Sequence, residues 1–200
     1  MNHVKRSHIP RDRFECLFSA ALNEFGNYSY DSASLNTIIR NAGMSKGSFY
    51  HWFHEKLTLY TWIVTCIAEE KNHQNMNTII GEDLDFFEYL RALLKQNLSF
   101  SQENPAYYYF WRKMLAEDPA FLERIKAPLL TSSKAMLEQK ILLEVKNGHI
   151  ASNYDITHVA GLIMFVLLHL DELVNPKMNA DEISSLADTS IAMLKDGFGR

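Results

Sequence analysis

The stretch SLNTIIRNAGMSKGSFYHWF, residues 34–53, decides the fold. Ser34 and Ser45 each precede a short run with apolar residues three and four positions apart, which is typical of two helices that begin at serine N-caps. Gly43 ends the first run and leaves a turn of only a few residues before the second. Because two helices joined so closely must cross steeply, this stretch predicts a helix-turn-helix.

The first turn of the second predicted helix carries small or basic residues: Ser45, Lys46, Gly47 and Ser48. In a helix-turn-helix this end enters the major groove of DNA, where bulky side chains would block the approach. Gly47 costs about 1 kcal/mol of helix stability relative to alanine, which favours close contact with another molecule. A glycine that is merely tolerated on the surface is the alternative.

Periodic apolar positions between Gly and Pro residues predict further helices on both sides of this unit. Upstream, residues 10–25 form an amphipathic segment that starts near Pro10 and ends at Gly26, and it completes a three-helix head. Downstream, helices are expected at residues 56–80, 84–100, 106–117, 121–146 (interrupted at Pro128), 155–174 and 180–195.

Composition excludes several classes of protein. With 47% hydrophobic and 22% charged residues, and with only 8 Gly and 5 Pro, the chain has the balance of a compact protein rather than a disordered or collagen-like one. The longest apolar stretch, residues 159–168, is about half as long as a membrane-spanning helix requires. Two cysteines, Cys16 and Cys66, are too few for a disulfide framework. Without an export signal, we expect the cytoplasm.

Charge is distributed unevenly along the chain. Residues 1–60 carry 7 Lys and Arg against 5 Asp and Glu, a net +2, whereas the remainder carries 13 against 19, a net −6. Lys5, Arg6, Arg11 and Arg13 make the first 13 residues a basic arm of net charge +3. Such an arm is able to contact phosphates, and a solvated tail is the alternative.

Residues 34–60, SLNTIIRNAGMSKGSFYHWFHEKLTLY, combine a set of specific features: Ser34, Ala42-Gly43, residues 45–48, Tyr50, Phe53 and Lys56. In this combination the stretch resembles the DNA-binding signature of the TetR family of bacterial transcriptional regulators. The preceding AALNEF, residues 20–25, is similar to the end of that family's first helix. The chain departs from the family pattern at Ser29, where a glycine is usual, and at Glu55, where a serine often caps the next helix.

The resemblance implies a sequence-specific DNA-binding regulator without a cofactor, a metal or a catalytic residue. It assigns phosphate contacts to Ser34, Tyr50 and Lys56, while base edges are approached by Asn36, Lys46, Gly47, Ser48 and His51. The complete expected DNA-binding set is Ser34, Asn36, Thr37, Ser45, Lys46, Gly47, Ser48, Tyr50, His51 and Lys56. Hydroxyl and lysine groups suit positioning contacts, and Asn and Lys side chains pair with adenine and guanine edges.

The eighth predicted helix points to a dimer. Its sequence VAGLIMFVLL, residues 159–168, is apolar around the whole helix and must be covered on all sides. Together with the ninth helix it can form a four-helix bundle with a second copy of the chain, and the resulting homodimer would bind a pseudo-palindromic operator. An internal eighth helix is the alternative.

The aromatic run PAYYYFWRKM, residues 105–114, is the candidate sensor of a small-molecule effector. An apolar pocket with a few polar groups is expected from Trp62, Cys66, Phe100, Tyr107, Tyr108, Trp111, Met114, Phe165 and His169. Aromatic core packing without a ligand is the alternative. We therefore predict an all-α fold in which a three-helix DNA-binding head, residues 1–54, precedes a six-helix ligand-sensing and dimerisation domain, residues 55–200.

Three functions are weighed on this fold. The preferred one is a homodimeric repressor that a small apolar or aromatic ligand releases from its operator. The second is an architectural DNA-binding protein without a ligand. The third, a helical enzyme, is disfavoured because His158 and His169 are eleven positions apart, too far to chelate one ion.

Overall fold

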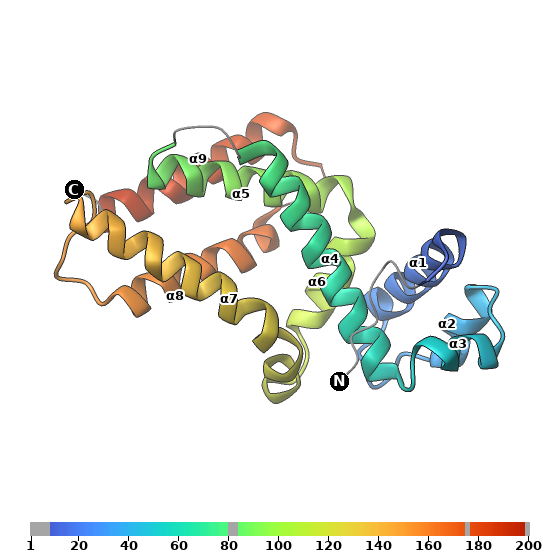
Figure 1. Cartoon of the computed structure of the whole chain (residues 1–200). Helices are drawn as coiled ribbons and strands as arrows, with labels where there is room; N and C mark the ends of the chain where they lie inside the picture. Colours follow the sequence, from blue (N-terminus) through green and yellow to red (C-terminus); the bar gives the residue numbers. More distant parts are fainter. Residues whose placement is uncertain (1–8, 80–83, 175–176, 199–200) are drawn as a thin grey trace. The chain divides into compact units, whose positions relative to one another are not determined.

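The computed structural model describes residues 9–79, 84–174 and 177–198. Within these residues the chain forms nine α-helices and one short 3-10 helix, and no β-strand (Figure 1). The elements are α1 (Arg11–Asn27), α2 (Leu35–Asn41), α3 (Lys46–Trp52), α4 (Lys56–Ile79), α5 (Phe86–Glu103), α6 (Pro105–Leu115), α7 (Pro119–Lys146), α8 (Ile156–His169), η2 (Leu170–Leu173) and α9 (Ala180–Phe198). The predicted all-α fold is confirmed.

Most helix boundaries differ from the predicted ones by a few residues. Helix α1 continues one residue past Gly26, and the eighth helix ends at His169, where a 3-10 turn follows. The predicted interruption at Pro128 is wrong, because α7 runs through this residue. Proline removes only one N–H donor, so a long helix can continue when the neighbouring turns keep their hydrogen bonds. Residue 80, the predicted end of the fourth helix, lies outside the described residues.

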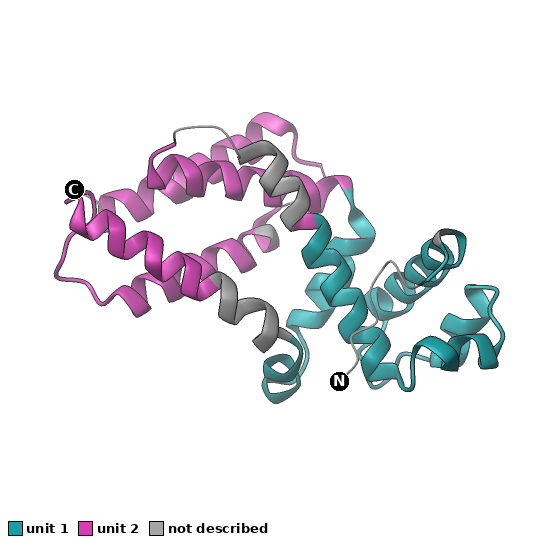
Figure 2. Ribbon diagram, in the orientation of Figure 1, with its two compact units in different colours: residues 1–70, 104–127 teal, residues 71–103, 128–200 magenta. Residues whose placement is uncertain are grey.

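The chain divides into two compact units (Figure 2). Unit 1 comprises residues 1–70 and 104–127, and unit 2 comprises residues 71–103 and 128–200. Unit 1 thus contains α1–α3, α6 and the first parts of α4 and α7. These two units are defined by packing. The predicted boundary after residue 54 instead separates residues expected to bind DNA from residues expected to sense a ligand, and this functional boundary stays a prediction.

An aromatic core holds unit 1 together. Phe25 from α1, Tyr60 from α4 and Phe110 from α6 are almost completely buried, and their ring centroids lie 4.8–6.4 Å apart. Helices α1 and α6 approach closely at Gly26, where an added Cβ would lie 3.4 Å from the backbone nitrogen of Phe110. Since buried aromatic side chains contribute large apolar areas, this core fixes α1 against α4 and α6.

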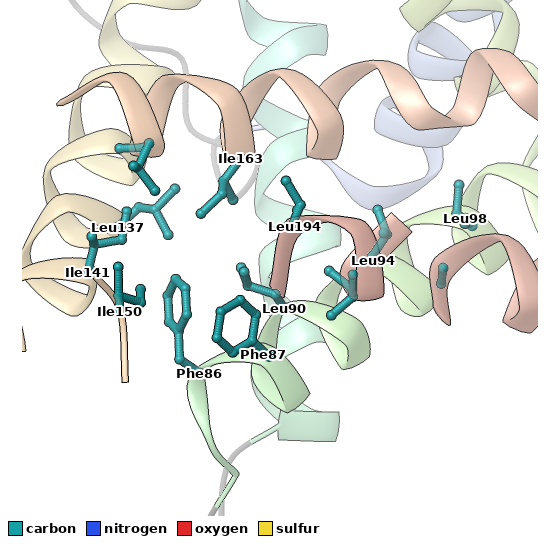
Figure 3. Close-up of a cluster of buried hydrophobic side chains, with 14 of the residues drawn as sticks. Phe86, Phe87, Leu90, Leu94, Leu98, Leu137, Ile141, Ile150, Ile163 and Leu194 are labelled. Atoms are coloured by element: carbon teal, nitrogen blue, oxygen red, sulfur yellow. The ribbon is translucent and has the colours of Figure 1, made fainter. Parts of the chain in front are cut away.

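Unit 2 has a separate aliphatic core formed by α5, α7, α8 and α9 (Figure 3). Phe86, Leu90 and Leu94 of α5 are buried in it with Ile163 of α8 and Leu194 of α9. Two reciprocal capping boxes define helix starts here. Asp85 pairs with Glu88 at α5, and Asn179 pairs with Glu182 at α9, each through two hydrogen bonds of 2.8–3.1 Å.

Candidate nucleic-acid interface

Serine side chains start both helices of the helix-turn-helix, as predicted. Ser34 Oγ accepts a hydrogen bond of 3.3 Å from the backbone N–H of Thr37 at the start of α2. Ser45 Oγ accepts one of 3.1 Å from the backbone N–H of Ser48 at the start of α3. Each cap satisfies a backbone donor that has no partner within its own helix.

The turn between α2 and α3 depends on Gly43, whose φ of +64° lies in the left-handed region. The backbone N–H of Met44 donates to the carbonyl of Ile39 over 3.1 Å. The backbone N–H of Gly43 donates to the carbonyl of Arg40 over 3.0 Å. This pattern is a Schellman motif, which ends a helix at a left-handed glycine. It directs the chain into α3 within a few residues.

Buried side chains of α2 and α3 fix the outward direction of the remaining ones. Ile38, Ile39, Phe49 and Phe53 are buried, and the rings of Phe49 and Phe53 stack with centroids 5.4 Å apart. Because a helix alternates its faces every three or four residues, the intervening positions face solvent.

The expected DNA-binding residues therefore lie on the surface of the head. Asn36, Ser45, Lys46, Gly47, Tyr50 and His51 are exposed, and Ser34, Thr37, Ser48 and Lys56 are partly buried. An added Cβ at Gly47 would have no atom within 4 Å, so the first turn of α3 is open to a close approach. The roles of these residues toward DNA stay predictions.

Lys56, expected to contact a phosphate, is bound to its own chain. Its Nζ donates to the carbonyls of Asp31 and Ala33 over 3.1 and 3.0 Å, and lies 4.6 Å from the centre of the Tyr30 ring. An ammonium group has three donors, and two of them serve the loop between α1 and α2. Lys56 thus holds this loop against the start of α4.

Two glutamates hold the same loop. Glu24 of α1 is buried, and its Oε1 accepts a hydrogen bond of 2.8 Å from the backbone N–H of Ser34. Glu117 Oε1, just after α6, accepts one of 2.6 Å from the backbone N–H of Tyr30. We call residues 28–34 the α1–α2 loop, and its backbone is tied to three other segments of unit 1.

Two tyrosines, Tyr30 in this loop and Tyr60 in α4, are kept neutral. Burial raises the pKa of Tyr60 well above its usual value, and the nearby carboxylate of Glu117 raises it further. Burial also raises the pKa of Tyr30, and the negative charges of Glu55 and Asp31 raise it further. The phenol groups therefore serve in packing and stay protonated at neutral pH.

One residue at the interface was not singled out from the sequence as a partner of α3. Arg13, exposed on α1, donates from Nη1 to Ser48 Oγ over 2.9 Å. The sequence signal was only its place in the basic arm, and a contact across 35 positions has no local pattern. Of the other arm residues, Lys5 and Arg6 lie outside the described residues, and only the backbone of Arg11 is described.

The expected effector-binding residues fall in both compact units. In unit 1, Trp62, Cys66 and Met114 are buried, and Tyr107, Tyr108 and Trp111 are partly buried. In unit 2, Phe100 is buried, His169 is partly buried and Phe165 is exposed. The proposed pocket as a whole stays a prediction.

Within unit 1, part of the expected set is contiguous. Phe18 packs edge-on against both Trp62 and Tyr107, with centroid distances of 6.0 and 5.6 Å. The indole N–H of Trp62 is buried and has no acceptor among the described residues. Buried indole groups usually have a hydrogen-bond partner, so this is an unusual polar group in an apolar cluster.

The surface of unit 2 carries large apolar side chains on α8 and α9. Leu162 and Phe165 are 50% and 61% exposed on α8, and Met193 is 73% exposed on α9. An added Cβ at Gly161, on the same side of α8 as Phe165, would have no atom within 4 Å. The fully apolar helix is therefore only partly covered by its own chain.

The described residues contain no group of three or more His, Cys, Asp or Glu side chains that could hold a metal ion. His169 Nδ1 lies 2.8 Å from Glu172 Oε1, an exposed local pair three positions apart. Among the described helices, none is both long and apolar enough to cross a membrane.

Comparison with known proteins finds a family whose members resemble this head. Residues 17–61 match the family described as "Bacterial regulatory proteins, tetR family". The HTH-type transcriptional regulator YhgD of Bacillus subtilis (strain 168), itself uncharacterized, is 21% identical over 179 residues, which cover 88% of this chain and 93% of YhgD.

Solved structures share the whole fold. A TetR family transcriptional regulator from Chloroflexus aurantiacus J-10-FL superposes with a TM-score of 0.72 at 24% identity, over 97% of this chain and 96% of that one. The fatty acid degradation regulator FadR from Bacillus halodurans gives a TM-score of 0.74 at 14% identity, over 93% and 95%. The chain therefore carries, on an all-α fold, the N-terminal helix-turn-helix signature of the TetR family of bacterial transcriptional regulators.

Proposed function

We propose that this protein is a sequence-specific DNA-binding repressor that acts as a homodimer and leaves its operator when a small apolar or aromatic ligand binds. The observation that carries the proposal is the first turn of α3. Lys46 and Gly47 are exposed there above the buried Phe49, and Ser45 caps the helix. A capped helix with a small, basic N-terminal end is the geometry that enters a major groove.

The division of contacts follows from side-chain chemistry. Ser34, Tyr50 and Lys56 supply phosphate contacts, which position the head without reading sequence. Asn36 and Lys46 supply the base contacts, since their side chains match adenine and guanine edges. Lys56 has one ammonium donor left for this purpose beyond the two that bind the α1–α2 loop.

Dimerisation through α8 and α9 is supported by the exposed apolar side chains of Leu162, Phe165 and Met193. Exposed apolar clusters on one surface mark sites of association. Gly161 leaves space for a helix of the second copy to approach α8 closely. A two-fold dimer presents two α3 helices to half-sites about 34–36 Å apart, or a multiple of this distance.

Release by an apolar ligand is supported by the aromatic side chains around Trp62 in unit 1. Its unpartnered indole N–H is a polar group available to a ligand. The fatty acid degradation regulator FadR has the same fold, and its name suggests acyl compounds among the ligands to test first. A repressor acting on chromosomal operators works in the cytoplasm of a bacterial cell.

The test is selection of random DNA duplexes by the purified protein at two salt concentrations, followed by sequencing of the bound pool. We expect an enriched inverted repeat. Affinity for the repeat should then fall when the correct apolar ligand is added. Binding without any enriched sequence, lost at modest salt, would instead identify an architectural DNA-binding protein.

A further inference from the structure

The contact between Arg13 and Ser48 joins α1 to the first turn of α3. Nη1 of Arg13 lies 2.9 Å from Ser48 Oγ, and both side chains are accessible at the surface. In the described part of the chain, no carboxylate oxygen lies within ion-pair distance of Arg13. Among the described residues, the guanidinium therefore has no carboxylate partner.

The chemistry of the two groups fixes the direction of this hydrogen bond. A guanidinium has five donors and no acceptor, so Ser48 Oγ must accept. A hydroxyl also carries one proton of its own, which then points away from Arg13. No acceptor for this proton lies within hydrogen-bonding distance of Ser48 Oγ among the described residues. The Ser48 hydroxyl keeps its proton and one lone pair on the exposed side of α3, and the positive charge of the adjacent guanidinium disfavours a second donor at that lone pair.

Without Arg13, the Ser48 hydroxyl would have no preference between donating and accepting a hydrogen bond. Free rotation lets a serine donate to a base or accept from one, so serine alone distinguishes bases poorly. Guanine N7 and O6, adenine N7 and thymine O4 are acceptors in the major groove, whereas cytosine presents only its amino donor. With one lone pair occupied and a guanidinium charge beside it, Ser48 Oγ is a better donor than acceptor, which disfavours the cytosine amino group at the position that Ser48 contacts.

We propose that Arg13 is a positioning residue that determines specificity: it holds the Ser48 hydroxyl as a donor, so that α3 rejects cytosine at one position of each half-site. The inference rests on the proposed DNA-binding function and adds a residue and a base preference to it. Arg13 acts through Ser48, and its charge adds a general attraction to the phosphate backbone.

The experiment is duplex selection, as above, with the full-length protein and the variants Arg13→Ala, Arg13→Lys, Ser48→Ala and the Arg13→Ala/Ser48→Ala double variant. We expect Arg13→Ala and Ser48→Ala to lose the rejection of cytosine at the same base pair, about threefold to tenfold. The double variant should lose no more than either single variant. Arg13→Lys keeps a charged donor and should retain the preference.

The matched control is Arg112→Ala, which removes the same charge from α6 in the same compact unit. Arg112 is exposed, and its guanidinium contacts Tyr108 of its own helix. It should leave the base preference unchanged. Circular dichroism and melting temperature show whether each variant keeps its fold.

Two results would overturn the inference about Arg13 while leaving the proposed DNA-binding function intact. If Arg13→Ala weakens binding to all sequences equally, Arg13 is a phosphate contact only. If it changes a base pair that Ser48→Ala does not change, Arg13 contacts a base directly. If the unmodified protein enriches no sequence, the proposed function falls, and the inference falls with it.

Discussion

Single residues on α3 divide sharply between the core and the solvent. Phe49 is completely buried, while its neighbours Lys46, Gly47 and Tyr50 are exposed. The buried ring sets the orientation of the helix, so a substitution on the exposed side changes binding without changing packing. Stability and DNA affinity can therefore be altered separately at this element.

Gly47→Ala is expected to change these two quantities in opposite directions. The added methyl group meets no atom within 4 Å, and alanine should raise helix stability by up to about 1 kcal/mol. The same methyl group occupies the surface that approaches the groove, so operator affinity should fall. Thermal melting and operator titration measure the two effects. Unchanged affinity would show that Gly47 does not lie close to DNA.

Lys46→Ala should change the base preference alone, whereas Lys56→Ala should lower both the stability of the protein and its affinity for every DNA sequence. Lys46 is exposed on α3, so its removal should leave the melting temperature unchanged while relaxing one base preference. Lys56 binds two carbonyls of the α1–α2 loop, and its loss should lower the free energy of unfolding by about 2 kcal/mol. It should also weaken binding to every sequence and flatten the salt dependence. Equal effects of both variants on stability and on specificity would contradict this division.

At the scale of elements, caps and turns were predicted well because their signals are local. Ser34, Gly43 and Ser45 each act on backbone groups within five positions, and the sequence shows those neighbours directly. The hydrogen bonds between Glu117 and Tyr30 and between Arg13 and Ser48 join residues 87 and 35 positions apart. No local sequence pattern predicts contacts over such separations. Such pairs form only when α1 packs against α3 and when the α1–α2 loop packs against the end of α6.

The same reasoning explains the boundary errors. Glycine and proline are common at helix ends, so the sequence predicts an end at Gly26 and an interruption at Pro128. At Gly26 the small residue instead allows α6 to approach α1. Tertiary packing thus places Gly26 inside a helix.

Gly43→Ala should destabilise the turn between α2 and α3. At a φ of +64° an alanine costs about 1–2 kcal/mol, which should lower the melting temperature of the protein. Gly197→Ala is the matched control, because Gly197 lies near the end of α9, where φ is not positive and an added Cβ meets no atom. A Gly43→Ala protein as stable as the control would mean that the turn adopts another backbone conformation.

At the scale of the whole molecule, the apolar surface of α8 and α9 determines the predicted assembly. Phe165→Glu places a charge on the most exposed aromatic side chain of α8, and a buried unpaired charge strongly opposes association. We expect monomers by sedimentation velocity. Operator affinity of the monomeric variant should also fall, since each copy then binds only one half-site.

Leu143→Glu is the control for this variant. Leu143 is 55% exposed on α7, similar to Phe165, and lies outside the two helices of the proposed interface. This variant should remain dimeric. Dissociation of both variants would place the contact between the two copies on a broader surface that includes α7.

The ties of the α1–α2 loop have a consequence for how this sequence can evolve. Glu24, Lys56 and Glu117 all bind backbone atoms of residues 30–34. Exchange of a side chain within the loop for another, proline at positions 30 and 34 excepted, removes none of these bonds. The exposed loop positions 31 and 32 are thus free to change in sequence, while the bonds that hold the loop backbone come from three positions outside it.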